Sequence, residues 1–212
     1  MRDYFWGNQE EQMEMPLSSR KKDAIPYENS NDNDFNFVEA ANNRIYFYSM
    51  VNRPKILKLN KSIQNLNNHM RCREVTFGGT ETPIRLHINS YGGSVFAGLS
   101  AVDYIAGSSV PVESIVEGCA ASAATLMSVV AKKRFIRQNA CMLIHQLSGH
   151  MWGKFEEMKD DMKNSEMLMK KIKDIYRAHC KIPEDVLENI LKHDLWWDAE
   201  TCLKYGLVDE II

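Results

Sequence analysis

Residues 84–130 read IRLHINSYGGSVFAGLSAVDYIAGSSVPVESIVEGCAASAATLMSVV. The first six residues alternate between apolar and polar, which predicts a strand, and the Gly-Gly pair at 92–93 predicts a tight turn. An amphipathic helix follows, then a second apolar strand that we expect to end at Gly118, and then a buried helix over 120–130. This order of strand, helix, strand and helix predicts parallel βαβ units with right-handed crossovers, and therefore an α/β layer fold.

The flanking segments continue the same pattern. Short runs rich in β-branched, aromatic and other apolar residues predict strands, and apolar residues spaced by three and four predict helices. The expected strands are 44–48, 135–136, 142–144 and a final strand that begins at 206–208, and the expected helices are 57–73, 154–179 and a short one that starts at Pro183. The helix over 154–179 carries a Met-rich stripe, which suits packing on its own sheet and packing on a partner equally well.

Residues 1–34 differ from the rest of the chain. They are mostly polar and show no helical or strand period, so we expect a flexible N-terminal extension or a removable leader before a domain over 35–212. Three consecutive aromatic residues interrupt the polar sequence: Tyr4, Phe5 and Trp6. They suit a docking motif as well as a simple disordered extension.

Composition excludes several classes of protein. The chain has 212 residues, 44% of them hydrophobic, and a formal net charge of -2, so nothing calls for nucleic acid or a membrane surface as partner. The five cysteines are scattered and form no C-x-x-C pair, which predicts reduced thiols in a cytosol-like compartment and argues against a zinc site or a disulfide framework. No secretory signal and no apolar run long enough to cross a bilayer are visible.

Two segments of residues 84–130 could carry chemistry. The Gly-Gly turn lets backbone approach an anionic oxygen or an extended peptide, while the Walker and G-x-G-x-x-G phosphate patterns are missing. Ser122 lies among small residues at a strand-to-helix junction, where free N–H groups favour a developing oxyanion. Taken alone, each feature is explained at least as well by tight packing without catalysis.

Two further segments supply partners for a serine nucleophile. His145 ends a strongly apolar strand, and the segment KHDLWWD at 192–198 offers several ionisable groups that could orient it. A Ser–His–Asp triad needs a nucleophile, a base that takes its proton and a carboxylate that fixes the imidazole tautomer. The residues alone leave open which group of 192–198 has the last role.

Four stretches together resemble ClpP, the proteolytic subunit of ATP-dependent Clp proteases. They are INSYGGSVFAG at 88–98, GCAAS at 118–122, MLIHQ at 142–146 and YGLVD at 205–209, in the order of the family. The resemblance runs from about Ile45 to Ile212 and implies a ClpP/crotonase-like α/β fold of repeated ββα/βαβ units, with a protruding handle helix over about 147–180. The chain departs from the usual pattern at Tyr91, at Ala123-Ala124 and at Leu147.

The resemblance also assigns roles to residues. It implies Ser122 as nucleophile, His145 as general base and Asp194, not Asp198, as the acidic member. The backbone N–H groups of Gly93 and Ala123 would form the oxyanion hole. The implied substrate groove, where peptide binds as an added strand, is formed by Gly92, Gly93, Ser94, Val95, Gln146, Leu147, Ser148 and Gly149, with His150 and Met151 beyond them.

The resemblance further implies a serine endopeptidase that cuts unfolded polypeptides inside two stacked heptameric rings. An AAA+ unfoldase of the ClpX, ClpA or ClpC type would deliver substrate and use ATP, and this chain itself would hold no cofactor and no metal. We expect a cytoplasmic location, or an equivalent reducing compartment such as a plastid, or the host cytoplasm for a viral protein. The alternatives are a catalytically silent ring subunit, a ClpP-like phage prohead protease that works without an unfoldase, and a crotonase-like acyl-CoA enzyme.

Overall fold

The computed structural model describes residues 38–77, 82–149 and 152–212, so the predicted extension over 1–34 lies outside the described residues. Its centre is one eight-stranded sheet. The strands are β1 (Val38–Ala41), β2 (Arg44–Phe47), β3 (Ile84–Ser90), β4 (Val112–Ala121), β5 (Lys133–Ile136), β6 (Cys141–Leu143), β7 (Trp196–Trp197) and β8 (Glu210–Ile211). The helices are α1 (Arg53–Phe77), α2 (Val95–Ala106), α3 (Ala123–Val129), α4 (Phe155–His179), α5 (Glu184–Ile190) and α6 (Ala199–Lys204).

The sheet is mostly parallel, as the βαβ pattern predicts. Its order is β1-β2-β3-β4-β5-β8, with β6 added beside the end of β4 and β7 beside β6. The pairs β1·β2 and β6·β7 are antiparallel, and the other pairs are parallel. Strand β3 and most of β4 are buried, because they are central strands of the sheet. The α/β fold expected from the sequence is therefore confirmed.

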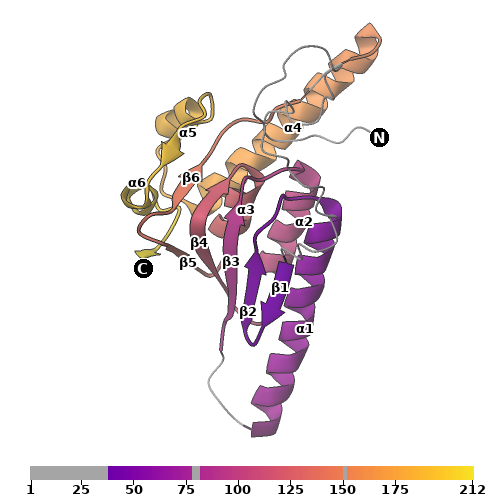
Figure 1. Ribbon diagram of the computed structural model, residues 1–212. Helices are drawn as coiled ribbons and strands as arrows, with labels where there is room; N and C mark the ends of the chain where they lie inside the picture. The colour runs from indigo at the N-terminus through magenta and orange to yellow at the C-terminus, as the bar shows by residue number, and fades with distance from the viewer. Residues whose placement is uncertain (1–37, 78–81, 150–151) are drawn as a thin grey trace, which may run out of the picture.

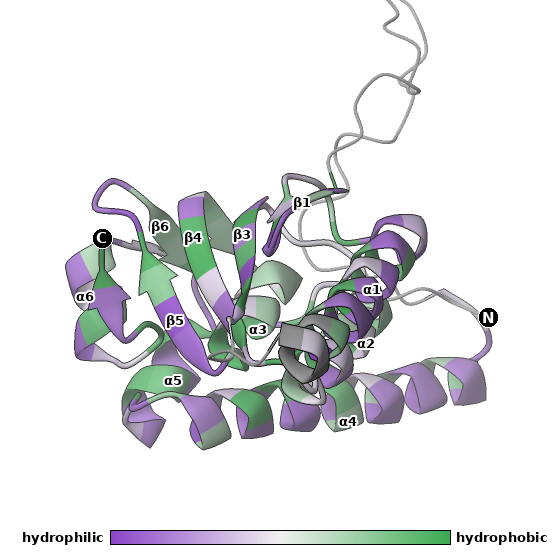
Figure 2. Ribbon diagram, turned by 90° about the horizontal axis from the view of Figure 1, so that it is seen from below, coloured by the Kyte–Doolittle hydropathy of each residue, from purple (hydrophilic) through white to green (hydrophobic). Residues whose placement is uncertain are grey.

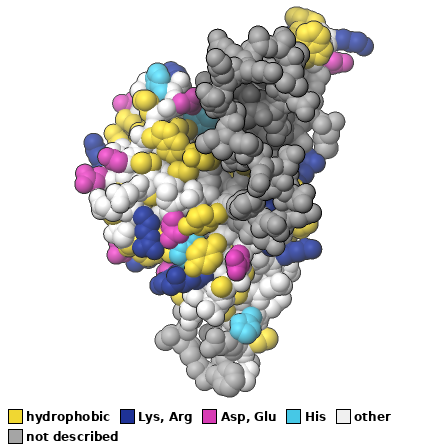
Figure 3. Space-filling view, in the orientation of Figure 1, with side chains coloured by type: hydrophobic (Ala, Val, Ile, Leu, Met, Phe, Trp, Pro, Cys, Tyr) yellow, Lys and Arg dark blue, Asp and Glu magenta, His cyan; other side chains and the backbone are white. Residues whose placement is uncertain are grey.

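Helices α1, α2 and α3 lie together on one side of the sheet, while α6 lies at its other end, against β6, β7 and β8 (Figure 1). Helix α2 packs between α1 and α3, and α3 packs in turn on α4. Seen from below, the apolar centre of the body contrasts with the more hydrophilic α4 (Figure 2). On the face turned towards the viewer in Figure 1, hydrophobic side chains lie next to charged ones (Figure 3).

The second predicted strand is longer than expected, and Gly118 does not end it. Strand β4 continues to Ala121, and the register against β3 shifts between the pairs Ile88↔Val116 and Ser90↔Ala120. Between these pairs a single residue of β3, Asn89, faces three residues of β4, which makes an irregular bulge. Gly118 lies in this bulge with φ of 75°, a conformation that glycine adopts without steric cost. The buried helix consequently begins at Ala123 rather than at residue 120.

The long helix α4 matches the predicted handle and extends beyond the body of the molecule (Figure 1). Its C-terminal half buries Leu168, Ile172 and Tyr176 against the domain. Its N-terminal half leaves Met158 and Met162 exposed. The C-terminal half of the helix therefore packs on its own domain, while packing of the N-terminal half on a partner stays a prediction. None of the helices in the described residues is long and apolar enough to cross a bilayer.

Candidate active site

Ser122 and His145 leave the sheet at the same edge because β4 and β6 run in parallel. Ala121 is paired with Leu143, and the N–H of Ser122 donates to the carbonyl of Leu143 at 2.9 Å. Carboxyl ends of neighbouring parallel strands meet at one edge of a sheet, which is where ligands bind in open α/β folds. The topology therefore brings two of the three predicted side chains to one place.

Strand β7 brings the acidic residue. It runs antiparallel to β6, with Leu143 opposite Trp196 and Met142 opposite Trp197. Carried two residues further, this register sets position 145 opposite position 194. The Nδ1 atom of His145 lies 2.8 Å from Oδ1 of Asp194.

Asp198, the other acidic candidate, points elsewhere. It is the N-cap of α6, and its side chain accepts a hydrogen bond from the N–H of Thr201 at 2.8 Å. Among the two carboxylates of 192–198, the structure therefore brings only Asp194 to His145.

Ser122 adopts a strained backbone conformation, with φ of 60° and ψ of -129°. Such angles are uncommon for a residue with a side chain, and they cluster at functional sites. The side chain of Thr125 donates to the Ser122 carbonyl at 2.6 Å, and the N–H of Thr125 donates to the same oxygen at 3.0 Å. The turn is thus held in place by α3 itself.

The Ser122 hydroxyl is buried and has no hydrogen-bond partner among the described residues. It therefore makes no hydrogen bond to His145, although the imidazole is bonded to Asp194. Catalytic hydrogen bonds are often long in substrate-free structures and tighten when substrate binds. The structure thus contains a His145–Asp194 pair and, at the same edge of the sheet, a serine hydroxyl that makes no hydrogen bond to a described residue.

The imidazole of His145 is set up to be neutral at physiological pH. Burial lowers its pKa, and the charge of Asp194 and its hydrogen bond act in the opposite direction without cancelling the effect. With Nδ1 facing a carboxylate, a neutral ring carries its proton on Nδ1 and presents Nε2 as acceptor. The side chain of Asp194 is 74% exposed, which weakens its influence because water screens it.

The Gly92-Gly93 segment passes directly beside Ser122. A Cβ atom on Gly92 would lie 2.6 Å from Cβ and 2.9 Å from Oγ of Ser122, and φ there is 91°. Gly93 has φ of 143° and lies opposite Val51. The backbone of Val51 bonds to Gly92 on one side of Gly93 and to Ser94 on the other. Only glycine allows this close approach, so the sequence interpretation of the turn as a site of backbone contact is consistent with the geometry.

The predicted oxyanion donors lie on either side of the serine. Val51 accepts from Ser94 and donates to Gly92, so it uses the backbone groups that flank Gly93. In extended backbone, neighbouring residues direct their N–H and C=O groups to opposite sides, so the N–H of Gly93 points away from Val51. Ala123 begins α3, where the first N–H groups lack intrahelical acceptors. In the described part of the chain, neither amide has a hydrogen-bond acceptor.

The other predicted groove residues fall into two groups. Ser94 is the N-cap of α2 and Val95 is fully buried, so both support the Gly-Gly segment. The N–H of Gln146 bonds to the carbonyl of Leu191 at 2.7 Å, and the N–H of Leu147 bonds to the sulfur of Met169 at 3.1 Å. These two amides are therefore already occupied. Ser148 and Gly149 follow in the same irregular segment, while His150 and Met151 lie outside the described residues.

Sequence reasoning missed one residue pair of the site. Thr125 bonds to the Tyr176 hydroxyl, which is buried in α4. The pair spans 51 positions of the chain, and neither residue lies in a recognisable motif. No local signal could have found it.

Comparison with known proteins places this geometry in a family. The family model described as Clp protease matches residues 39–212. The chain belongs to the Clp protease family. A solved structure of a ClpP1 mutant from Listeria monocytogenes is similar in fold, with a TM-score of 0.67 and 24% sequence identity, over 78% of this chain and 88% of that one. The Clp protease fold thus accounts for the whole described domain.

The described residues offer no alternative site for metal chemistry. Nowhere in these ranges do three or more His, Cys, Asp or Glu side chains gather closely enough to hold a metal ion. The cysteines of the described ranges are free thiols, and burial raises the pKa of Cys202 to about 12. The Cys202 thiol is therefore protonated at neutral pH and a poor nucleophile.

Proposed function

We propose that this Clp protease family member is a serine endopeptidase that uses Ser122, His145 and Asp194. The observation that carries the proposal is the 2.8 Å contact between His145 Nδ1 and Asp194 Oδ1, next to a serine in a strained strand-to-helix turn. A serine hydroxyl becomes a nucleophile when a neighbouring imidazole takes its proton. The lowered pKa of His145 keeps that imidazole in its basic form.

The proposed reaction is acyl transfer to the serine. His145 takes the proton of Ser122 through Nε2 as the oxygen attacks a peptide carbonyl, and it later gives this proton to the leaving amine. The carbonyl oxygen becomes an oxyanion between the N–H groups of Gly93 and Ala123. Water then hydrolyses the acyl-enzyme with His145 acting again as base, and Asp194 stabilises the imidazolium in both halves.

The substrate is proposed to be an unfolded polypeptide bound in extended form. The C=O group of Gly93 points away from Val51 and can accept a hydrogen bond from an added strand, which is a common way of binding a peptide, while its N–H remains for the oxyanion. We infer that the chain works inside two stacked heptameric rings, with an AAA+ unfoldase as the partner that uses ATP. In such an assembly the exposed N-terminal half of α4 would lie between the rings, which accounts for its exposed methionines.

The first test is labelling with a fluorophosphonate, which reacts only with an activated serine. We expect stoichiometric labelling of Ser122 in the parent protein and none in Ser122→Ala. The matched control is Ser62→Ala, a serine of α1 far from the site in sequence, which should be labelled like the parent. Peptide hydrolysis should fall by roughly 10⁶ in Ser122→Ala, as in comparable triads.

Other outcomes would distinguish the alternatives. A correctly assembled chain that neither reacts with the probe nor cleaves peptides would be a silent ring subunit, and the catalytic proposal would be wrong. Light scattering gives the mass of the assembly independently of catalysis. Degradation of an unfolded protein without any ATPase present would instead favour a protease that works without an unfoldase.

A further inference from the structure

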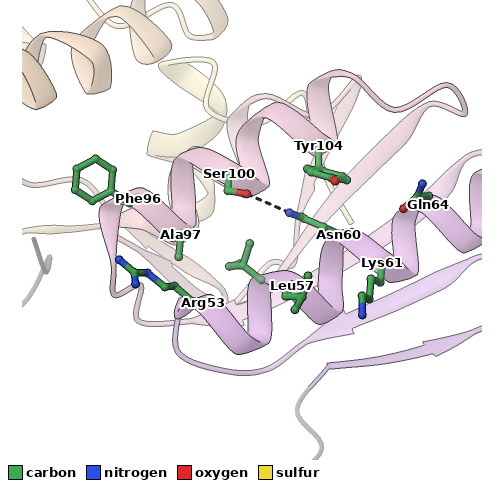
Figure 4. Close-up of a pocket in the computed structure, with 10 residues that line it drawn as sticks. Arg53, Leu57, Asn60, Lys61, Gln64, Phe96, Ala97, Ser100 and Tyr104 are labelled. Atoms are coloured by element: carbon green, nitrogen blue, oxygen red, sulfur yellow. Dashed lines mark hydrogen bonds between the residues drawn. The ribbon is translucent and has the colours of Figure 1, made fainter. Parts of the chain in front are cut away.

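A cavity between α1 and α2 lies outside the proposed active site (Figure 4). Its volume is about 460 Å³, within the range of ligand pockets. Leu57, Phe96 and Tyr104 form an apolar rim and are each 43–56% exposed. Exposed aromatic residues that line one hollow are a feature of binding sites rather than of ordinary surface.

The floor of the cavity carries a buried polar atom with no partner. Asn60 is 6% exposed, and its Nδ2 donates to the Ser100 hydroxyl at 3.2 Å (Figure 4). Its Oδ1 is buried and accepts no hydrogen bond from any described residue. An unsatisfied buried acceptor is unfavourable, and a rotation of the Asn60 amide towards the cavity would let an N–H or O–H donor bound there satisfy it.

The charge around the cavity is positive. Residues 53–61 include Arg53, Lys55, Lys58 and Lys61 and no acidic residue. Arg53 and Lys61 line the cavity. Carboxylates bound here would be stabilised both by these cations and by the positive end of the helix dipole. The cavity thus suits an aromatic side chain with an N–H or O–H group, flanked by acidic residues.

The chain itself contains such a segment. Residues 1–15 read MRDYFWGNQEEQMEM and combine three consecutive aromatic residues with four carboxylates and a single arginine. The indole of Trp6 has an apolar body and an N–H donor. We propose that the segment Asp3–Glu14 docks in the α1–α2 cavity of its own chain, with Trp6 in the hollow and the carboxylates beside the cations of α1.

Connection through the chain favours this occupant over a free partner. Residues 7–37 join Trp6 to β1, and a segment of this length, at up to about 3.3–3.6 Å per residue, is long enough to reach the cavity of its own domain. A tethered segment has an effective concentration on the order of millimolar, so modest affinity keeps the cavity filled. Tyr27 also lies near acidic residues, but it has no second aromatic residue beside it.

The test uses the full chain with p-benzoylphenylalanine in place of Phe5, which leaves Trp6 intact. After irradiation and digestion, we expect crosslinks to peptides from 53–64 and 95–106. Trp6→Ala should lower the yield by about threefold to tenfold, and Tyr27→Ala should leave it unchanged, because an anchoring aromatic residue contributes far more than a bystander.

Charge is tested on the same helix. Lys61→Glu should lower the crosslink yield, whereas Arg71→Glu, an exposed residue outside the cavity, should not. Raising the salt concentration should act like Lys61→Glu because salt screens surface charges. Equal yields in the two charge variants, crosslinks to any other surface, or crosslinks only between isotopically light and heavy chains would each overturn the proposal.

Discussion

Thr125 and Tyr176 connect the candidate nucleophile to the handle helix through two hydrogen bonds. A hydroxyl group has one proton, and Thr125 uses its proton on the Ser122 carbonyl. Tyr176 must therefore donate to Thr125 in their buried contact. Burial raises the pKa of Tyr176 far enough that the phenol keeps its proton at any physiological pH. The direction of donation therefore runs from Tyr176 to Thr125 and from Thr125 to the Ser122 carbonyl, because each hydroxyl has one proton to donate.

This order predicts unequal effects of two conservative substitutions. Thr125→Val keeps the shape but leaves the buried Tyr176 hydroxyl without an acceptor, which should lower the free energy of unfolding by about 1–3 kcal/mol. Tyr176→Phe removes one donor while Thr125 still bonds to Ser122, so the loss should be about 0.5–1.5 kcal/mol. The double variant contains no orphaned hydroxyl, and its loss should be smaller than the sum by about 1 kcal/mol.

Urea denaturation followed by circular dichroism measures all four forms, at one protein concentration because assembly adds to apparent stability. Equal m-values would show that the same surface is exposed in each case. The fluorophosphonate labelling rate at Ser122 provides a second readout. It should fall in Thr125→Val, which loses a bond to the Ser122 carbonyl, and change little in Tyr176→Phe. Strictly additive stabilities would refute the proposed order of donors.

Three further predictions follow from the site and its surroundings. Gly92→Ala should abolish peptide cleavage and lower the melting temperature. The added Cβ would lie 2.6 Å from Cβ of Ser122, and the backbone at position 92 has φ of 91°, which alanine rarely adopts. A variant that is still active in a cleavage assay would contradict the close approach. In a pH–rate profile of the parent protein, the acid limb of kcat/KM should lie below pH 6.5, because burial lowers the pKa of His145. Asp194→Asn should lower kcat by roughly 10⁴. The same variant should move the remaining acid limb to still lower pH, because the charge that raises the pKa of His145 is lost. Arg134→Lys should lower the free energy of unfolding by about 1–3 kcal/mol in urea titrations. The guanidinium group of Arg134 bonds to both carboxylate oxygens of Asp209 and to two backbone carbonyls, and a lysine ammonium cannot make all of these bonds. An unchanged urea midpoint would be incompatible with this role.

Local sequence predicts the centre of the fold well because local rules act there. The alternation over 84–89, the Gly-Gly pair and the apolar helix after it each specify a single element, and all three agree with one another. The bulge at Gly118 was mistaken for a strand end because a glycine with positive φ serves both purposes. Only the partner strand decides between them, through the shifted register of β3 and β4.

The candidate site is less predictable from residues alone because its members come from three separate strand ends. Ser122 could be identified as a candidate from its small neighbours and His145 from the apolar strand before it. Asp194 and Asp198 could not be distinguished by residue type, since both are carboxylates in one short segment. The structure separates them through position: one lies opposite His145, and the other caps α6.

The geometry of the pair His145–Asp194 is therefore a property of strand register. Because β6 and β7 are antiparallel, the numbers of opposed residues have a constant sum: Leu143 with Trp196 and Met142 with Trp197 both give 339, as do His145 and Asp194. A slip of one residue would set His193 or Leu195 opposite His145 and send the carboxylate to the other face. The register of β6 and β7 is thus as necessary for the candidate triad as the carboxylate itself, although Trp196 and Trp197 need not touch the reacting atoms.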